Sequence, residues 1–240
     1  AIKAADRAIE TAEGLTNYTL VSSSTFYMPT YAHSEVEWRY GNGQLKYGYI
    51  PSRELLSKYS DNDCRKKFWF NASGKTTKKT PDYSEGMGPT NTLRISEAYL
   101  NRAEAYAQMD KASEALADLN DLRRCRIVGY EDISIENVTD ILDEVRLERR
   151  LELCYDEQRW FDLRRYAVHP KYPSTKEIVH DHYFYDNSIR QVTYVGSYKL
   201  NMYESEPAYV IPIPQHVIEF NKGNMVDNET RPDREAFIRF

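Results

Sequence analysis

Two consecutive stretches of helical periodicity place the strongest constraint on the fold of this 240-residue chain. Between residues 92 and 126, apolar and small residues recur every three or four positions, which is the spacing of one face of an α-helix. The pattern breaks at Asp110, and it predicts one helix to about Gln108 and a second from about Ala112. Two helices joined by so short a turn lie antiparallel. The sequence therefore predicts a helical hairpin over these residues.

The sizes of the periodic residues resemble those of a tetratricopeptide hairpin, in which large and small packing residues alternate along the two helices. In chain order they are Tyr99, Ala103, Tyr106, Ala115, Leu119 and Leu122, and only the last is larger than this pattern expects. One hairpin cannot bury both of its faces, so it needs neighbouring helices. The candidates are helices over residues 1–14 and 139–166. Together these segments predict a mostly α-helical protein with a helical core over residues 92–168.

The remaining segments, residues 18–91 and 169–240, consist of short alternating runs interrupted by Ser, Gly, Asn and Pro. For residues 18–91 this composition predicts an aromatic, loop-rich insertion with a small β-hairpin near Gly41 and Gly43. Residues 169–240 are expected to be irregular, and the alternating prolines of "YVIPIPQHV" favour an extended course. We expect residues 1–240 to form a single domain.

Composition excludes several classes of function. The net charge of −5 gives no general attraction for the phosphates of nucleic acid. The three cysteines lack the spacing of a zinc site or a disulfide framework, and His180 and His182 lack a third ligand at fixed spacing. No phosphate loop or hydrolase nucleophile motif is present. We therefore expect no metal, no cofactor and no catalytic residues.

Charged residues occupy the core-facing side of the helix predicted over residues 139–166. On an ideal helix, Arg149, Glu152, Asp156 and Arg159 fall within a sector of about 80° that also holds the apolar residues. Asp162 and Arg165 add another pair of opposite charge. Each carboxylate has an arginine at helical spacing, which favours paired, ionised groups over a catalytic acid and base. These six residues are predicted to form a structural ion network.

Several segments together resemble the C-terminal part of the SusD/RagB family. In order they are "LRISEAYLNRAEAYAQ", "EALADLNDLRRCR", "LERRLELCYDEQRWFDLRRY" and "YVIPIPQHVIEFNKG", with "SEVEW" and "YIPSRELLSKYSDNDCRKKFWF" upstream. The chain departs from the family pattern twice. Asp156 and Glu157 stand where the family usually has Glu-Gly, and "MVDNETRPDREAF" replaces a tail of the Gln-Asn-Pro-Gly type.

The resemblance implies an α/α superhelix of tetratricopeptide-like hairpins with long loops that bind oligosaccharide. It further implies a non-enzymatic lipoprotein on the outer face of the outer membrane of Bacteroidetes, within a polysaccharide-uptake system. Such proteins work with a SusC-like TonB-dependent transporter, to which they hand the glycan. The chain begins without an initiator methionine or signal sequence, so we expect the lipid-bearing cysteine to lie outside it.

Oligosaccharide binding requires flat aromatic rings for the apolar faces of sugars, usually on loops held by a rigid scaffold. Residues 27–49 combine tyrosines with histidine, arginine, asparagine and glutamine side chains. The predicted carbohydrate-binding residues are Tyr31, Trp38, Tyr40 and Tyr47, with Tyr83 from a later loop. An alternative for Trp38 is a place in the core, and Tyr40 and Tyr47 fit either role.

Two other functions remain open at this point. A helical-repeat adaptor that binds a peptide is favoured if the concave helical face carries exposed polar anchors. A glycoside hydrolase requires two carboxylates about 5 to 9.5 Å apart across a cleft. The loop carboxylates placed for this role are Glu35, Glu37, Asp82, Glu85, Glu204 and Glu206.

Overall fold

The structure is a computed structural model that describes residues 1–21, 35–40, 51–70, 91–186, 188–189, 191–222, 224–228 and 233–238. Its contacts divide the chain into two compact units, Ala1–Arg159 and Trp160–Phe240. The single domain expected over residues 1–240 stays a prediction. Among the described residues, no helix combines the length and apolar character needed to cross a membrane.

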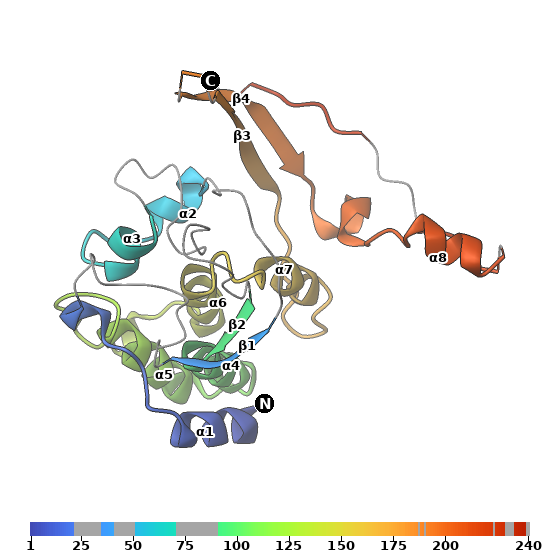
Figure 1. Ribbon diagram of the computed structural model, residues 1–240. Coiled ribbons are helices and arrows are strands. Elements are labelled where there is room, and N and C mark those ends of the chain that lie inside the picture. Colours follow the sequence, from blue (N-terminus) through green and yellow to red (C-terminus); the bar gives the residue numbers. More distant parts are fainter. Residues whose placement is uncertain are drawn as a thin grey trace. The chain divides into compact units, whose positions relative to one another are not determined.

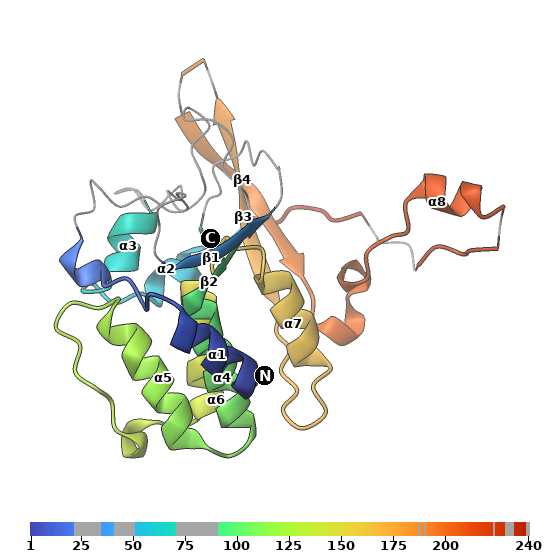
Figure 2. The ribbon, with the colours of Figure 1, turned by 60° about the horizontal axis from the view of Figure 1, so that its bottom comes forward.

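Four helices form the main body of the first unit (Figures 1 and 2). The central helix α4 packs against the other three, which also confirms the predicted helical hairpin of α4 and α5. Asp110 takes a left-handed backbone conformation with φ of 60° in the turn between them. Ala103 and Ala115 are fully buried, as small residues at a close helix contact must be. The four helices are α1 (Ile2–Thr11), α4 (Ile95–Gln108), α5 (Ala112–Arg124) and α6 (Ile141–Glu152).

A two-stranded antiparallel sheet connects segments that are distant in the sequence. Strand β1 (Val36–Tyr40) pairs with β2 (Asn91–Arg94), so that Val36 is opposite Arg94 and Tyr40 is opposite Asn91. The turn predicted near Gly41 and Gly43 lies outside the described residues. The observed partner of β1 is thus a strand that leads directly into α4.

An aromatic core joins the short helices of the first unit to the end of α6. Trp69 is fully buried and meets Tyr18 edge-on with ring centroids 6.3 Å apart. The cluster comprises Tyr18, Leu55, Tyr59, Cys64, Phe68, Trp69, Phe70, Leu151 and Cys154. Its short elements are η1 (Tyr18–Leu20), α2 (Arg53–Ser57) and α3 (Cys64–Trp69), and a further short helix, η3 (Ile135–Asn137), precedes α6. Cys64, Cys125 and Cys154, all within the described residues, form no disulfide bond.

The prediction of one continuous helix over residues 139–166 was wrong. Helix α6 ends at Glu152, and α7 (Arg159–Ala167) begins after a turn in which Tyr155 and Glu157 have positive φ. A side chain from another element caps the end of α6. Arg94 donates to the backbone carbonyl of Glu152 at 2.9 Å, the carbonyl that a continuing helix would pair with the N–H of residue 156. Helical periodicity in the sequence persists across this break and therefore conceals it.

The second unit contains a long β-hairpin within the segment predicted to be irregular, so that prediction was wrong for residues 178–200. Strand β3 (Ile178–Asp186) pairs with β4 (Gln191–Leu200) in an antiparallel sheet with one irregularity after His182 (Figure 2). Aromatic residues occur on both faces of this hairpin, which obscures the alternation expected of a half-buried strand. Beyond it lie η4 (Tyr203–Ser205), η5 (Pro207–Tyr209) and α8 (Gln215–Phe220). Trp160 is partly buried and stacks on Tyr209.

The last described segment packs against β4 at a glycine. Ser197 and Phe237 exchange two backbone hydrogen bonds of 2.7 and 2.9 Å. A Cβ atom at Gly196 would lie 2.9 Å from the Cβ of Ala236, which is closer than side chains normally approach. We expect Gly196→Val to release residues 233–238 from β4, because overpacking of this kind costs about 1–3 kcal/mol.

Hydrogen exchange at the Ser197 and Phe237 amides measures this release, and we expect protection to fall by about tenfold or more, the equivalent of 1.4 kcal/mol. Val195→Ala, at an exposed neighbouring position, is the control and should leave protection unchanged. Full protection in Gly196→Val would contradict the assigned contact.

Candidate functional site

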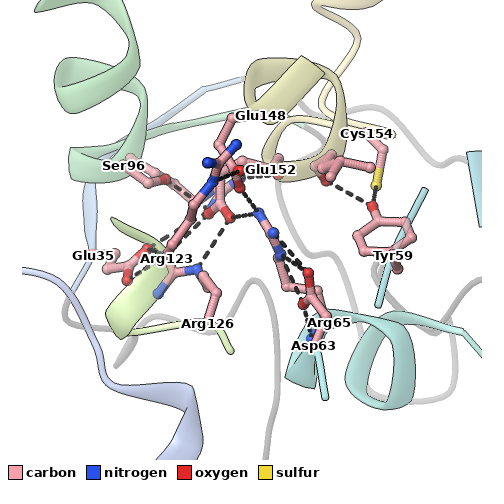
Figure 3. A network of polar contacts seen from close by, with 12 residues as sticks. Glu35, Tyr59, Asp63, Arg65, Ser96, Arg123, Arg126, Glu148, Glu152 and Cys154 are labelled. Carbon is pink, nitrogen blue, oxygen red and sulfur yellow. Dashed lines mark hydrogen bonds and ion pairs between the residues drawn. The ribbon is translucent and has the colours of Figure 1, made fainter. Parts of the chain in front are cut away.

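Glu152, at the C-terminal end of α6, is the centre of a buried network of ion pairs (Figure 3). Its side chain is completely buried. Three arginines from different parts of the first unit donate to it: Arg94 at 2.7 Å, and Arg65 and Arg126 at 3.0 Å. One carboxylate therefore joins α3, β2 and the segment after α5 to the end of α6.

A second carboxylate of α6, Glu148, extends the network. Arg65 and Arg123 both donate to Glu148 at 2.7 Å. Arg65 also donates to Asp63 through Nη2 at 2.7 Å and Nε at 3.0 Å, and Asp63 in turn caps the N-terminus of α3. Arg123 reaches Glu144 at 2.7 Å at the more exposed edge. The last turns of α6 are thereby fixed to α3 and α5.

Arg126 connects this network to the start of β1. Its Nη2 donates to both carboxylate oxygens of Glu35 at 2.8 Å, and its Nη1 donates to the carbonyl of Thr16 at 2.8 Å. The backbone N–H of Thr16 in turn donates to Glu35 at 2.8 Å. The guanidinium lies 3.8 Å from the centre of the Tyr18 ring, a cation–π contact. Residues 16 and 35 are therefore held together by one buried cation.

Charge is balanced in the buried part of the network. It contains four arginines and four carboxylates, and each of these eight side chains is at most 8% exposed. They are Arg65, Arg94, Arg123 and Arg126, and Glu35, Asp63, Glu148 and Glu152. Burial by itself raises the pKa of the Glu148 and Glu152 carboxyls, but the adjacent arginines outweigh it and hold both pKa values below their ordinary range. Carboxylates that are ionised and paired with arginines in this way hold the fold together and do not serve as proton donors.

A model of the SusD family matches residues 16–230 of the chain. The chain belongs to the SusD family. Solved structures of similar fold include a SusD-like protein from Bacteroides fragilis NCTC 9343 (18% identity, TM-score 0.61, covering 95% of this chain and 60% of that one). Another is a SusD superfamily protein from Bacteroides vulgatus ATCC 8482 (21% identity, TM-score 0.57, covering 97% and 53%). The chain thus spans less than two thirds of either relative, and no curated protein matches it.

The structure of this SusD-family chain places the predicted charged residues in several different environments. Glu152 and Asp156 both accept from Arg94. Arg149 instead donates to Asn101 at 2.8 Å and approaches Glu97 at 3.5 Å. Asp162 pairs with Arg165 at 2.9 Å in the second unit, and the partly buried Arg159, the last residue of the first unit, is the first residue of α7.

The sequence prediction paired each carboxylate with an arginine on the same helix. Asp162 has such a partner in Arg165, whereas Glu152 and Asp156 pair with Arg94 from β2. Sequence reasoning about this SusD-family chain missed Glu35, Arg65, Arg94, Arg123 and Arg126. The only local signal for these residues in the sequence is a charged residue that stands among apolar ones, as in "EVEW" and "LRIS". Such a pattern also fits a solvent-exposed residue beside a strand or helix.

The predicted carbohydrate-binding residues stay a prediction. Tyr31, Tyr47 and Tyr83 lie outside the described residues, and so do the side chains of Trp38 and Tyr40. The backbone of β1, which carries these last two, is described. Its ends are anchored by Glu35 on one side and by the pairing of residues 40 and 91 on the other.

Two of the loop carboxylates considered for a hydrolase are engaged in structural contacts. Glu35 is paired with Arg126, and the buried Glu206 accepts from the N–H groups of Asn201 and Ala208 and pairs with Arg234. Glu37 and Glu204 are exposed, and Asp82 and Glu85 lie outside the described residues. Among the residues that the structure describes, no three His, Cys, Asp or Glu side chains are placed to hold a metal ion.

Proposed function

We propose that this SusD-family chain is part of a non-enzymatic, cell-surface protein that binds oligosaccharide. The family match over residues 16–230 carries this proposal, and the helical fold shared with solved SusD-like structures supports it. In the same proposal, the full protein is lipid-anchored on the outer face of the outer membrane. There it passes glycan to a SusC-like TonB-dependent transporter.

The geometry of the first unit supports a scaffold that presents binding residues. The buried network anchors both β1 and its partner β2, because Arg94 at the end of β2 and Glu35 before β1 belong to it. Binding residues are commonly carried by loops attached to such a rigid frame. Tyr31, Trp38, Tyr40, Tyr47 and Tyr83 are proposed to supply the aromatic contacts with sugar rings.

Affinity electrophoresis through gels that contain single polysaccharides tests this function. We expect at least one glycan to retard the protein, and Tyr40→Ala and Tyr47→Ala to weaken that binding by about two- to tenfold, since an aromatic contact contributes about 0.5–1.5 kcal/mol. Tyr172→Ala, in the second unit, is the matched control and should bind normally.

A cooperatively melting protein that no polysaccharide retards would contradict glycan binding. If the same protein captured peptides from a random library, peptide binding would replace glycan binding as its function. Retardation that neither tyrosine variant changes would preserve the function and move its site away from residues 40 and 47.

A further inference from the structure

A cavity of about 330 Å³ lies between α5 and the segment that precedes α6 in the first unit. Leu116 and Ile133 contribute apolar surface to it, and Asn120, Arg124, Asp132 and Ser134 contribute polar groups. Pockets for small molecules range from about 300 to 1,000 Å³, so this one suits a ligand of about one ring. Its described lining residues do not belong to the buried ion network.

The wall of this cavity is fixed in place by Asn120, a buried residue of α5. Its Oδ1 accepts from the hydroxyl of Tyr130 at 2.6 Å and from the N–H of Ile133 at 3.3 Å. Its Nδ2 donates to the carbonyl of Ile133 at 3.1 Å. The amide thus ties residues 130–133 to α5 without a ligand, and its second N–H hydrogen remains available on the cavity wall.

The charges around the cavity favour a neutral ligand rich in hydroxyl groups. Arg124 is already paired, with Asp132 at 2.8 Å and with Asp121 at 2.8 Å, so it offers little to an anionic ligand. Glu136 adds a further carboxylate and accepts from the Ser134 hydroxyl. Carboxylate, amide and hydroxyl groups beside an apolar floor match a pyranose ring, which has hydroxyls at its edge and C–H groups on its faces.

We propose that this cavity is a subsite for one uncharged sugar ring of a glycan. The subsite rests on the proposed function and adds to it a second contact point, built from α5 and residues 130–136. Ile133, which is partly exposed, packs against a face of the ring. Asn120, Asp132 and Ser134 form hydrogen bonds with its hydroxyl groups.

The test uses ¹⁵N-labelled protein titrated with the methyl glycosides of glucose, galactose, mannose and N-acetylglucosamine. We expect at least one of them to shift the Asn120 side-chain amide and the backbone amides of Ile133 and Ser134. Ala117 is exposed on α5 and lines the cavity, so Ala117→Phe fills the space and should weaken binding by at least tenfold. Ala4→Phe, at an exposed alanine of α1, is the matched control and should bind like the parent.

Three outcomes would overturn the subsite: no shift at these amides with any glycoside, equal shifts in Ala117→Phe, or shifts caused only by lysine amide, added as a cationic probe. Gel retardation by a polysaccharide is measured separately. Retardation without amide shifts therefore rejects the subsite and leaves the proposed function standing.

Discussion

Glu152→Gln is expected to lower the melting temperature of the first unit by about 6–20 °C. The substitution keeps the size of the side chain and removes the one negative charge shared by Arg65, Arg94 and Arg126, which are all almost completely buried. Loss of one partner from a buried ion pair costs about 3–5 kcal/mol, because the remaining charges cannot be solvated. Each kcal/mol corresponds to about 2–4 °C for a protein of this size.

Glu144→Gln provides a matched control on the same helix. Among the residues that the structure describes, Glu144 forms an ion pair only with Arg123, and it is 37% exposed. Its replacement should therefore lower the melting temperature by less than about 4 °C. Circular dichroism during heating measures both variants, and urea unfolding gives the free energies. An equal decrease in melting temperature in the two variants would show that burial of the ion network does not govern its contribution to stability.

Acid is expected to unfold the first unit through the same carboxylates. The pKa values of Glu148 and Glu152 are lowered in the folded protein, so the unfolded chain binds more protons as the pH falls through the ordinary glutamate pKa of about 4.3. Their contribution is fully present well above that pH and is lost progressively toward the lower pKa of the folded state. Each carboxylate adds a slope of up to about 1.4 kcal/mol per pH unit, so the pair gives up to about 2.7.

Urea unfolding at a series of pH values from 7 to 3.5 measures this loss. Glu148→Gln should reduce the slope below pH 5 by up to about 1.4 kcal/mol per pH unit, because one titrating group is removed. Glu144→Gln again serves as the comparison and should keep most of the slope. An unchanged slope in Glu148→Gln would mean that other carboxylates control acid unfolding.

The sequence by itself determined the parts of the fold that depend on neighbouring residues. The end of α4 at Gln108 and the start of α5 at Ala112 follow from periodicity and from the break at Asp110, and the structure confirms them. Their packing is also local, since α4 and α5 contact each other across one short turn. The ordered set of segments resembling the SusD/RagB family, confirmed by the family match, likewise needed no coordinates.

Only the tertiary structure decided which charges meet and where α6 ends. Glu152 has arginines on its own helix, yet its partners are Arg65, Arg94 and Arg126, which reach it from other elements. Arg94 also caps the end of α6 by donating to the Glu152 carbonyl. Periodicity reports which face of a helix is buried, whereas pairing in the interior depends on distances between segments far apart in the chain. The β1–β2 pairing and the α5 cavity depend on such distances as well, because each forms only when separate segments fold against one another.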